Sequence, residues 1–324
     1  MMQFERGCDK EREPQPGEAN SVRKIMTDKP YLLLGVLFLL ASLVISGCGG
    51  IGLIATPAST SASVVELTPP PATFLTLTPP PTLAPSASPT PVIPDTGWER
   101  LRPGLGRRVI NLPGENGELF EHLYLLRLEP DDYHFDVAYR PQPQTLEAWQ
   151  LETNALIVLN GGYFRLEDGS AIPNGLSVVG GQGFGSTYGE FGGMFAVTGQ
   201  GPELRWLAQE PYNPSEPLLA AIQSFPVLVK PGGELGFPEQ EEDNRAARRS
   251  VIAMDRDGRV VLIVASIGNF TLHRLSAYLV GSDLDLDIAI NLDGGPSSGI
   301  LLANPFEGVP AYAPLPIVIT VRER

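Results

Sequence analysis

The sequence predicts an α+β domain, a strand-rich mixed sheet with few helices and long Gly-rich loops. Short apolar runs bounded by Gly, Pro and Asn recur through the last two thirds of the chain, which is typical of strands. A helical spacing of apolar residues occurs in only two places. No segment repeats at a fixed period, so a repeat architecture is not expected.

Nine apolar runs are predicted to be strands, and two segments are predicted to be helices. Asp257 and Gly258 predict a hairpin turn, because Asp-Gly supplies the positive φ that a tight turn needs. Thr271 is the expected N-cap of the second helix. The predicted strands are 123–128, 134–138, 156–159, 193–197, 227–229, 251–254, 260–265, 288–292 and 317–321, and the predicted helices are 145–152 and 271–280.

The first 48 residues are predicted to direct export. Basic residues precede an apolar run at 31–45, which ends in Ile45-Ser46-Gly47-Cys48. The last four residues resemble a bacterial lipobox, whose cysteine is diacylated and becomes the mature N-terminus. The alternative is an uncleaved anchor helix, since apolar character resumes after Cys48. Under both interpretations the rest of the chain lies outside the cytoplasm, and Met26 is the expected start codon.

Residues 49–95 are predicted to be a spacer between the membrane and a folded domain at 96–324. Pro, Thr and Ser dominate this segment, so it cannot bury a core. Fully extended, it reaches on the order of 120 Å. Because Cys8 is removed with the signal and Cys48 is lipidated, no disulfide is expected, and stability must come from a packed core.

The predicted domain is strongly acidic. Residues 96–324 hold 29 acidic residues against 16 arginines and a single lysine. This balance excludes nucleic acid as a partner. With three histidines and no free mature thiol, no metal site is expected, and no cofactor is specified.

The segment 291–299, Asn-Leu-Asp-Gly-Gly-Pro-Ser-Ser-Gly, is the strongest candidate for a functional turn. It follows a predicted buried strand and combines the Asp293 carboxylate with the glycines 294 and 295 and the hydroxyls of Ser297 and Ser298. Glycine-rich backbone can approach a ligand closely and can direct N–H groups at an anion. The segment also matches the G-x-S-x-G serine hydrolase motif, but no Asp or His follows Ser297, which excludes that mechanism.

Two other patterns fail their motifs. Residues 283–294 begin like a calcium loop but have Ile288 at the sixth position and Gly294 at the twelfth. The glycines at 181–185 have the wrong spacing for a dinucleotide site and lack a following helix. We interpret these segments as an acidic strand and a flexible loop.

A second turn has the same layout as the first. Asn160, Gly161, Gly162, Tyr163 and Phe164 follow another predicted strand. The two turns, at 160–164 and 291–299, are predicted to face one cleft. An aromatic ring beside carboxylate and amide groups is typical of a sugar site.

Arg245, Arg248 and Arg249 precede the predicted strand at 251–254. Such a cluster is commonly a solvated basic run. In so acidic a domain it is also the best available phosphate-binding patch.

These motifs together resemble the phosphodiester glycosidase family, which is related to the enzyme that uncovers mannose 6-phosphate by removing N-acetylglucosamine from a phosphodiester. The sequence departs from the family pattern at Ser250, Ala253 and Pro296, where Thr, Gly and Gly are usual. Pro296 removes an N–H from the expected anion-binding turn. The resemblance covers about residues 155–303 and consists of Asn160-Gly-Gly-Tyr-Phe, Gln223-Ser-Phe-Pro-Val-Leu-Val, Arg249-Ser-Val-Ile-Ala, Asp257-Gly-Arg, Thr271-Leu and Asn291-Leu-Asp-Gly-Gly-Pro-Ser-Ser.

The resemblance implies a membrane-tethered hydrolase that cleaves the C1–O bond of a sugar-1-phosphodiester. It implies Asp293 as the base or stabiliser of the oxocarbenium-like centre and Arg249 as the partner of the leaving phosphate. A second carboxylate is not identified among Glu167, Asp168 and Glu190. The alternatives are a glycan-binding surface lipoprotein without activity and a structural surface protein. The remaining substrate-binding candidates are Asn160, Gly161, Tyr163, Phe164, Ser224, Arg248, Asn291, Gly294, Gly295, Ser297 and Ser298.

Overall fold

The computed structural model describes residues 94–324. The predicted signal segment, the lipidation site Cys48 and the linker up to residue 93 lie outside the described residues. Within the described part, no helix is long and apolar enough to cross a membrane.

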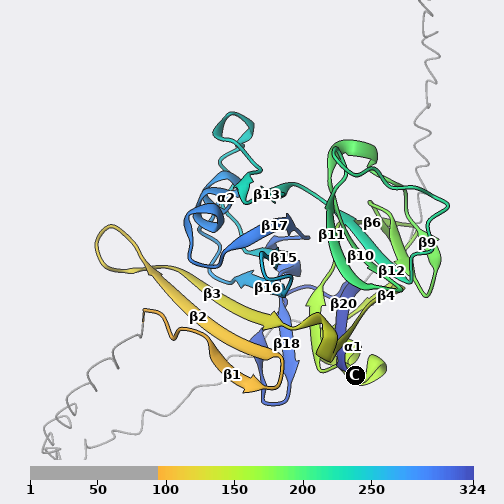
Figure 1. Cartoon of the computed structure of the whole chain (residues 1–324), viewed down its shortest axis with the longest axis horizontal. Helices are drawn as coiled ribbons and strands as arrows, with labels where there is room; N and C mark the ends of the chain where they lie inside the picture. The colour runs from red at the N-terminus through yellow and green to blue at the C-terminus, as the bar shows by residue number, and fades with distance from the viewer. Residues whose placement is uncertain (1–93) are drawn as a thin grey trace, which may run out of the picture. The chain divides into compact units, whose positions relative to one another are not determined.

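The α+β class predicted from the sequence is confirmed, with about half of the described chain in four sheets (Figure 1). The largest sheet has the strand order β1 (Glu99–Arg102), β2 (Leu105–Pro113), β3 (Leu119–Leu128), β16 (Val260–Ala265), β15 (Arg249–Asp255), β17 (Leu286–Asn291), β13 (Val227–Lys230) and β14 (Glu234–Leu235). The second has the order β11 (Gly201–Trp206), β10 (Gly193–Thr198), β12 (Ala220–Ser224), β8 (Ser177–Val179) and β9 (Gln182–Phe184). The third has the order β19 (Phe306–Val309), β18 (Ile300–Ala303), β5 (Ile157–Asn160), β20 (Leu315–Glu323) and β4 (Tyr133–Gln144). The smallest pairs β6 (Phe164–Glu167) with β7 (Ser170–Pro173).

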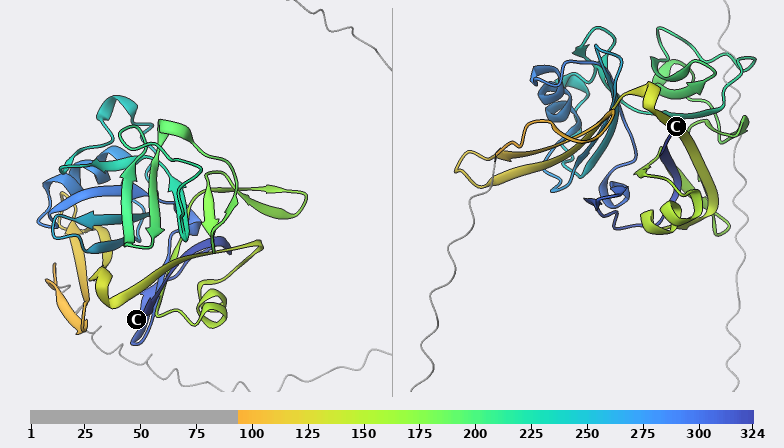
Figure 2. Two further views of the ribbon diagram at one scale, coloured as in Figure 1. Left: turned by 45° about the vertical axis from the view of Figure 1, so that its right-hand side comes forward. Right: turned by 60° about the horizontal axis from the view of Figure 1, so that its bottom comes forward.

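The strand pairings are antiparallel throughout residues 94–324, so the sheets are antiparallel rather than mixed. The long β2–β3 hairpin extends to one side of the domain (Figure 2). Residues 255–258 form the predicted turn between β15 and β16, with Gly258 at φ 82° and its N–H bonded to the Asp255 carbonyl.

The three large sheets share one apolar core. Strand β16 shows how the sequence builds it, because all six of its residues are apolar and buried. Val260, Leu262 and Val264 face the shared core, while the alternate residues face α2 (Leu272–Gly281) on the other side of the sheet. A strand covered on both faces needs a continuous apolar run, which is why β16 was predictable.

Two helices cover outer faces of the sheets. Helix α1 (Leu146–Thr153) begins at Thr145, whose hydroxyl accepts a bond from the Ala148 N–H, and buries Trp149 against the third sheet. Helix α2 begins at Thr271 in the same way, as predicted, and packs Leu275 and Leu279 on the largest sheet.

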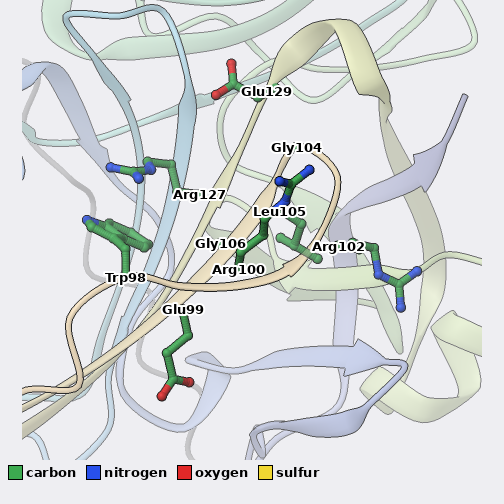
Figure 3. Close-up of a pocket in the computed structure, with 9 residues that line it drawn as sticks. All are labelled: Trp98, Glu99, Arg100, Arg102, Gly104, Leu105, Gly106, Arg127 and Glu129. Atoms are coloured by element: carbon green, nitrogen blue, oxygen red, sulfur yellow. The ribbon is translucent and has the colours of Figure 1, made fainter.

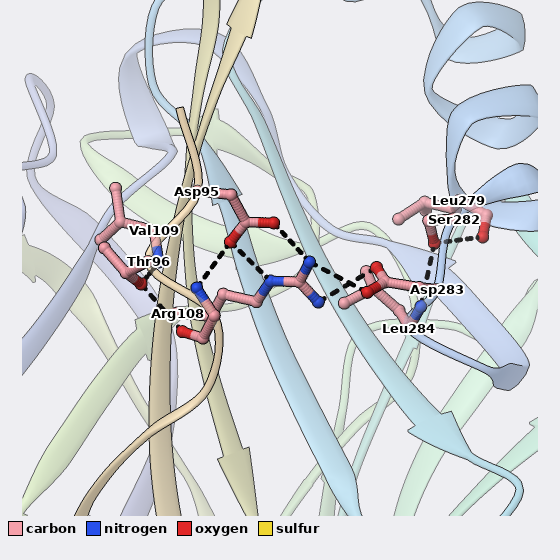
Figure 4. A network of polar contacts seen from close by, with 9 residues as sticks. Asp95, Thr96, Arg108, Val109, Leu279, Ser282, Asp283 and Leu284 are labelled. Atoms are coloured by element: carbon pink, nitrogen blue, oxygen red, sulfur yellow. Dashed lines mark hydrogen bonds and ion pairs between the residues drawn. The ribbon is translucent and has the colours of Figure 1, made fainter. Parts of the chain in front are cut away.

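An ion-pair network fixes the start of the folded region (Figure 4). Asp95 pairs with Ile110 as a β-bridge, and its carboxylate contacts the Arg108 guanidinium at 2.5 Å. The same guanidinium contacts Asp283 at 3.0 Å, in the segment between α2 and β17. The folded region therefore includes Asp95, which the sequence assigns to the linker. Arg107 and Arg108 also break the apolar pattern of β2, so that strand was not predicted.

Candidate active site

The turns that follow β5 and β17 lie against each other. The Asn160 side-chain amide donates to the Asp293 carbonyl at 2.7 Å, and its oxygen accepts from the Gly299 N–H at 3.1 Å. The Asp293 N–H donates to the Gly161 carbonyl at 3.0 Å. The two turns are 133 residues apart in sequence between Asn160 and Asp293. The fold therefore brings together the two segments that the sequence singled out.

Asn160 joins the two turns through its side chain. Its side chain is fully buried, and both polar atoms have backbone partners. Gly161 is required for close approach, since a Cβ there would lie 2.7 Å from Ile317 Cγ2. Phe164 packs against the shared core. The contacts of these three residues within the protein are structural, and their predicted contacts with substrate stay predictions.

The turn after Asp293 forms no anion-binding nest. The Gly294 N–H donates to the Asp293 carboxylate at 2.9 Å, and the Gly295 N–H donates to the Arg248 carbonyl. The N–H groups of Ser297 and Ser298 close the short 3₁₀ turn Gly295–Ser297, and Pro296 has none. Gly295 adopts φ 60°, the left-handed conformation that favours glycine. Because these N–H groups are used internally, binding of an anion depends on side chains.

Asp293 is a half-buried carboxyl at the end of β17. Burial raises its pKa, and hydrogen bonds from Ser297 and the Gly294 N–H oppose that rise. Burial, and secondarily the negative charge of Asp293, raise the pKa of two nearby tyrosines, Tyr163 and Tyr188; that of Tyr188 is raised to about 12. Both phenols are therefore neutral at physiological pH. Because the carboxyl is partly removed from water, its ionised form is a stronger base than that of an ordinary exposed Asp.

Arg249, the first residue of β15, has a buried guanidinium whose charge acts on Tyr163. It is 8% exposed and donates to the carbonyls of Phe270 at 3.3 Å and Arg245 at 2.6 Å. Burial lowers its pKa, while the groups of Tyr163, Asp243 and Glu242 act in the opposite direction. No carboxylate of residues 94–324 lies within ion-pair distance of Arg249. A buried cation that lacks such a partner is suited to bind an anion.

Arg248 has different surroundings from Arg249. Its guanidinium lies 4.1 Å from the centre of the Tyr312 ring and donates to the Pro310 carbonyl at 2.8 Å. Its other nitrogens, Nε and Nη1, are buried and have no hydrogen-bond partner within the described chain. Burial lowers its pKa. The two adjacent arginines therefore do not form a single patch with shared contacts.

Further buried polar atoms gather near the strand ends. The Asn291 amide donates to the Tyr163 hydroxyl at 2.8 Å and to the Phe225 carbonyl at 3.1 Å. Its side-chain oxygen has no partner in the part of the chain described. The hydroxyls of Ser224, Ser250 and Ser298 are likewise buried without a protein partner. Buried polar groups are normally satisfied, so these atoms indicate a place for ordered water or ligand.

The three candidates for a second carboxylate separate in space. Glu167 pairs with Arg165 at 2.5 Å on the exposed β6–β7 hairpin, and Asp168 occupies its turn at φ 48°. Of the three candidates, only Glu190 lines the cavity that Tyr163 also lines. Asp243, which the sequence did not single out, lines that cavity too and is one of the charges acting on Arg249. Asp243 and Tyr188 both lie in loops without a recognisable motif, so the sequence offered no signal for either residue.

A separate cavity of about 340 Å³ lies at the β1–β3 end (Figure 3). Arg127 stacks on Trp98 there, with 4.1 Å between the guanidinium carbon and the ring centre. None of the predicted site residues lines this cavity. Among residues 94–324, no group of three or more His, Cys, Asp and Glu side chains could hold a metal ion.

Antiparallel sheets around strand-end turns that carry a carboxyl, a buried guanidinium and an aromatic ring are the equipment of a glycan-processing enzyme. The family model of phosphodiester glycosidases matches residues 153–320. The chain belongs to the phosphodiester glycosidase family, as its motifs indicated.

One solved structure agrees with this assignment at the level of the fold. The catalytic domain of zebrafish N-acetylglucosamine-1-phosphodiester alpha-N-acetylglucosaminidase, auto-inhibited by its pro-peptide, is similar with a TM-score of 0.55 and 16% identity, over 70% of this chain and 86% of that chain. A hypothetical protein from Synechocystis matches with a TM-score of 0.46 and 15% identity, over 68% of this chain and 62% of that chain. No curated protein matches the sequence.

Proposed function

We propose that this protein hydrolyses the bond between C1 of a sugar and the oxygen of a phosphodiester. The observation that carries the proposal is a buried guanidinium without a carboxylate partner, Arg249, near the desolvated carboxyl Asp293. A Cβ built on Gly294, the residue after Asp293, would lie 3.8 Å from Nη1 of Arg249, so the guanidinium borders the turn that carries the carboxyl. Family membership supports a glycosidase activity.

The leaving phosphate is a weak base, so its departure needs no strong general acid. The reaction needs instead a cation to stabilise the phosphate and a base to take a proton from water. Water adds to C1 while the C1–O bond breaks, and the electron pair of that bond leaves with the phosphate. Arg249 stabilises the charge of the departing phosphate. Asp293 takes the proton of the attacking water, or stabilises the cationic centre at C1. Since its pKa is raised, the base form of Asp293 is lost at a higher pH than for an exposed Asp.

Asp293→Asn tests this assignment directly. We expect the substitution to reduce the release of free sugar from a panel of sugar-1-phosphodiesters and nucleotide sugars by at least about 100-fold. Asp131→Asn, at an exposed Asp outside the site, is the matched control and should retain activity. Full activity of Asp293→Asn, with an unchanged circular dichroism spectrum, would remove this residue from the mechanism.

The same panel separates catalysis from the non-catalytic alternative. If the wild-type protein binds these compounds in calorimetry without releasing sugar, it is a glycan-binding protein. We further propose that the protein acts outside the cytoplasm, held at the membrane by lipid on Cys48. The sequence of the first 48 residues supports this location.

A further inference from the structure

A cavity of about 550 Å³ opens beside Tyr163 and Phe225. This volume lies within the range of small-molecule sites. The rings of Tyr163 and Phe225 are 4.7 Å apart at 32° and form part of its wall. Trp206, at the end of β11, and Phe237 add two more partly exposed rings. Four aromatic side chains around one hollow offer apolar faces to the C–H groups of a sugar ring.

The cavity has a negatively charged rim. Glu190, Glu241 and Asp243 line it and are exposed, against one cation, Lys230. The Lys230 ammonium lies 4.9 Å from the centre of the Trp206 ring. It has no ion pair within the described residues. Carboxylates accept hydrogen bonds from sugar hydroxyls, and a net negative rim repels an anionic occupant.

The cavity adjoins the proposed phosphate position. Tyr163 lines it, and its hydroxyl accepts a hydrogen bond at 2.8 Å from the amide of Asn291, two residues before Asp293. Asp243 lines it too and lies two residues before Arg245, whose carbonyl accepts from the Arg249 guanidinium at 2.6 Å. The phosphodiester charge therefore has the Arg249 cation at the cavity's edge. The cavity itself offers the attached group apolar faces and three carboxylates against the single ammonium of Lys230.

We propose that this cavity binds a neutral pyranose, the sugar that the enzyme releases, and that Glu241 and Asp243 exclude acidic sugars. The proposal rests on the hydrolase function proposed above. It adds a specificity that the buried pair Asp293 and Arg249 does not itself supply. The two rim carboxylates exclude acidic sugars by their charge. Isosteric amides at these positions should therefore keep the hydrogen bonds to sugar hydroxyls but no longer discriminate against acidic sugars.

The test compares two methyl phosphodiesters, of glucose-1-phosphate and of glucuronic acid-1-phosphate. We expect the wild-type protein to prefer the glucose substrate, and the double variant Glu241→Gln with Asp243→Asn to reduce that preference about tenfold. The reduction should come from faster turnover of the glucuronic acid substrate. Any effect of Asp243 on Arg249 changes both substrates alike, so the ratio of the two kcat/KM values isolates the rim.

The matched control is Glu115→Gln with Glu118→Gln, which removes two exposed charges from the turn between β2 and β3. Its ratio should equal that of the wild type. An unchanged ratio in the rim variant, or no wild-type preference for the neutral sugar, would overturn the proposal.

Calorimetry with glucose and glucuronic acid separates this proposal from the hydrolase function. If no substrate is turned over, tighter binding of glucose, with glucuronic acid binding restored in the rim variant, still supports the neutral-sugar cavity. Equal binding of both sugars, or binding of neither, would contradict it.

Discussion

Asp293 and Arg249 are two ionisable residues that the fold removes from water without joining them to an ion partner. Among the described residues, the 14 ion pairs include neither of them. Desolvation acts on each in the direction expected from its charge, raising the pKa of Asp293 and lowering that of Arg249. An arrangement that costs folding stability in this way is typical of a functional site.

The pKa of Asp293 predicts how stability depends on pH. Its pKa is higher in the folded than in the unfolded protein, so its ionised form reduces stability above the folded pKa. This cost disappears as pH falls below about 4, the unfolded value. Asp293→Asn removes the ionisable group and should raise Tm by about 2 °C or more at pH 8. Thermal unfolding at pH 8 and at about pH 3 measures this, with no difference expected at the lower pH, where Asp293 is protonated in both states. A lower Tm of the variant at pH 8 would contradict it.

At the scale of elements, the loop at 266–270 positions Arg249. The carboxylate of Glu121, in β3, is fully buried and accepts bonds from the N–H groups of Ile267, Gly268 and Asn269 at 2.7 to 3.0 Å. The next carbonyl, of Phe270, accepts from the Arg249 guanidinium. Glu121 lies outside residues 153–320, so the N-terminal strands hold a loop of the family domain.

Glu121→Gln should therefore destabilise the domain. Its amide nitrogen would face N–H donors that now bind a carboxylate oxygen, leaving buried donors unsatisfied at a cost on the order of 3 kcal/mol. Urea unfolding monitored by tryptophan fluorescence measures the change in the free energy of unfolding. Glu118→Gln, at an exposed position of the same hairpin, should stay within about 0.5 kcal/mol of the wild type. Equal stability of the two variants would show that the bonds to this loop contribute little.

Which elements were predictable follows from their burial. The runs that became β3, β10, β16 and β17 are apolar because core covers them. Strand β12 has the sequence Ala-Ala-Ile-Gln-Ser, and all five residues are buried. It was not predicted because small and polar residues dominate it, and these give no strand signal. Its last residues, Gln223 and Ser224, are buried, and each keeps one polar atom without a partner among the described residues, which breaks the apolar pattern of a strand.

At the scale of the whole molecule, a folded domain at 94–324 follows a segment whose composition favours an extended chain. The predicted lipid on Cys48 would place the active domain at a distance from the membrane set by this segment. A lipoprotein and a protein with an uncleaved anchor should respond differently to the replacement of Cys48.

Cys48→Ser distinguishes the two kinds of attachment. If Cys48 is lipidated, the wild-type protein should partition into the detergent phase of Triton X-114 and should incorporate labelled palmitate in a bacterial host. The variant should lose the label, because serine cannot form the thioether that carries the lipid. Partitioning of both proteins into the detergent phase, without label in either, would support an uncleaved anchor instead.

The sequence by itself determined the α+β class, the strands with fully apolar runs, both helices and the family, because these depend on local pattern and on motifs that are continuous in the chain. Only the tertiary structure decided how the motif residues are used. It showed that Asn160 joins two turns, that Phe164 packs against the core while partly exposed, and that the N–H groups of the glycine turn bond within the protein. It also brought Asp243 to the cavity beside Tyr163. Hydrogen-bond partners and desolvation depend on residues distant in sequence, so no local pattern could predict them.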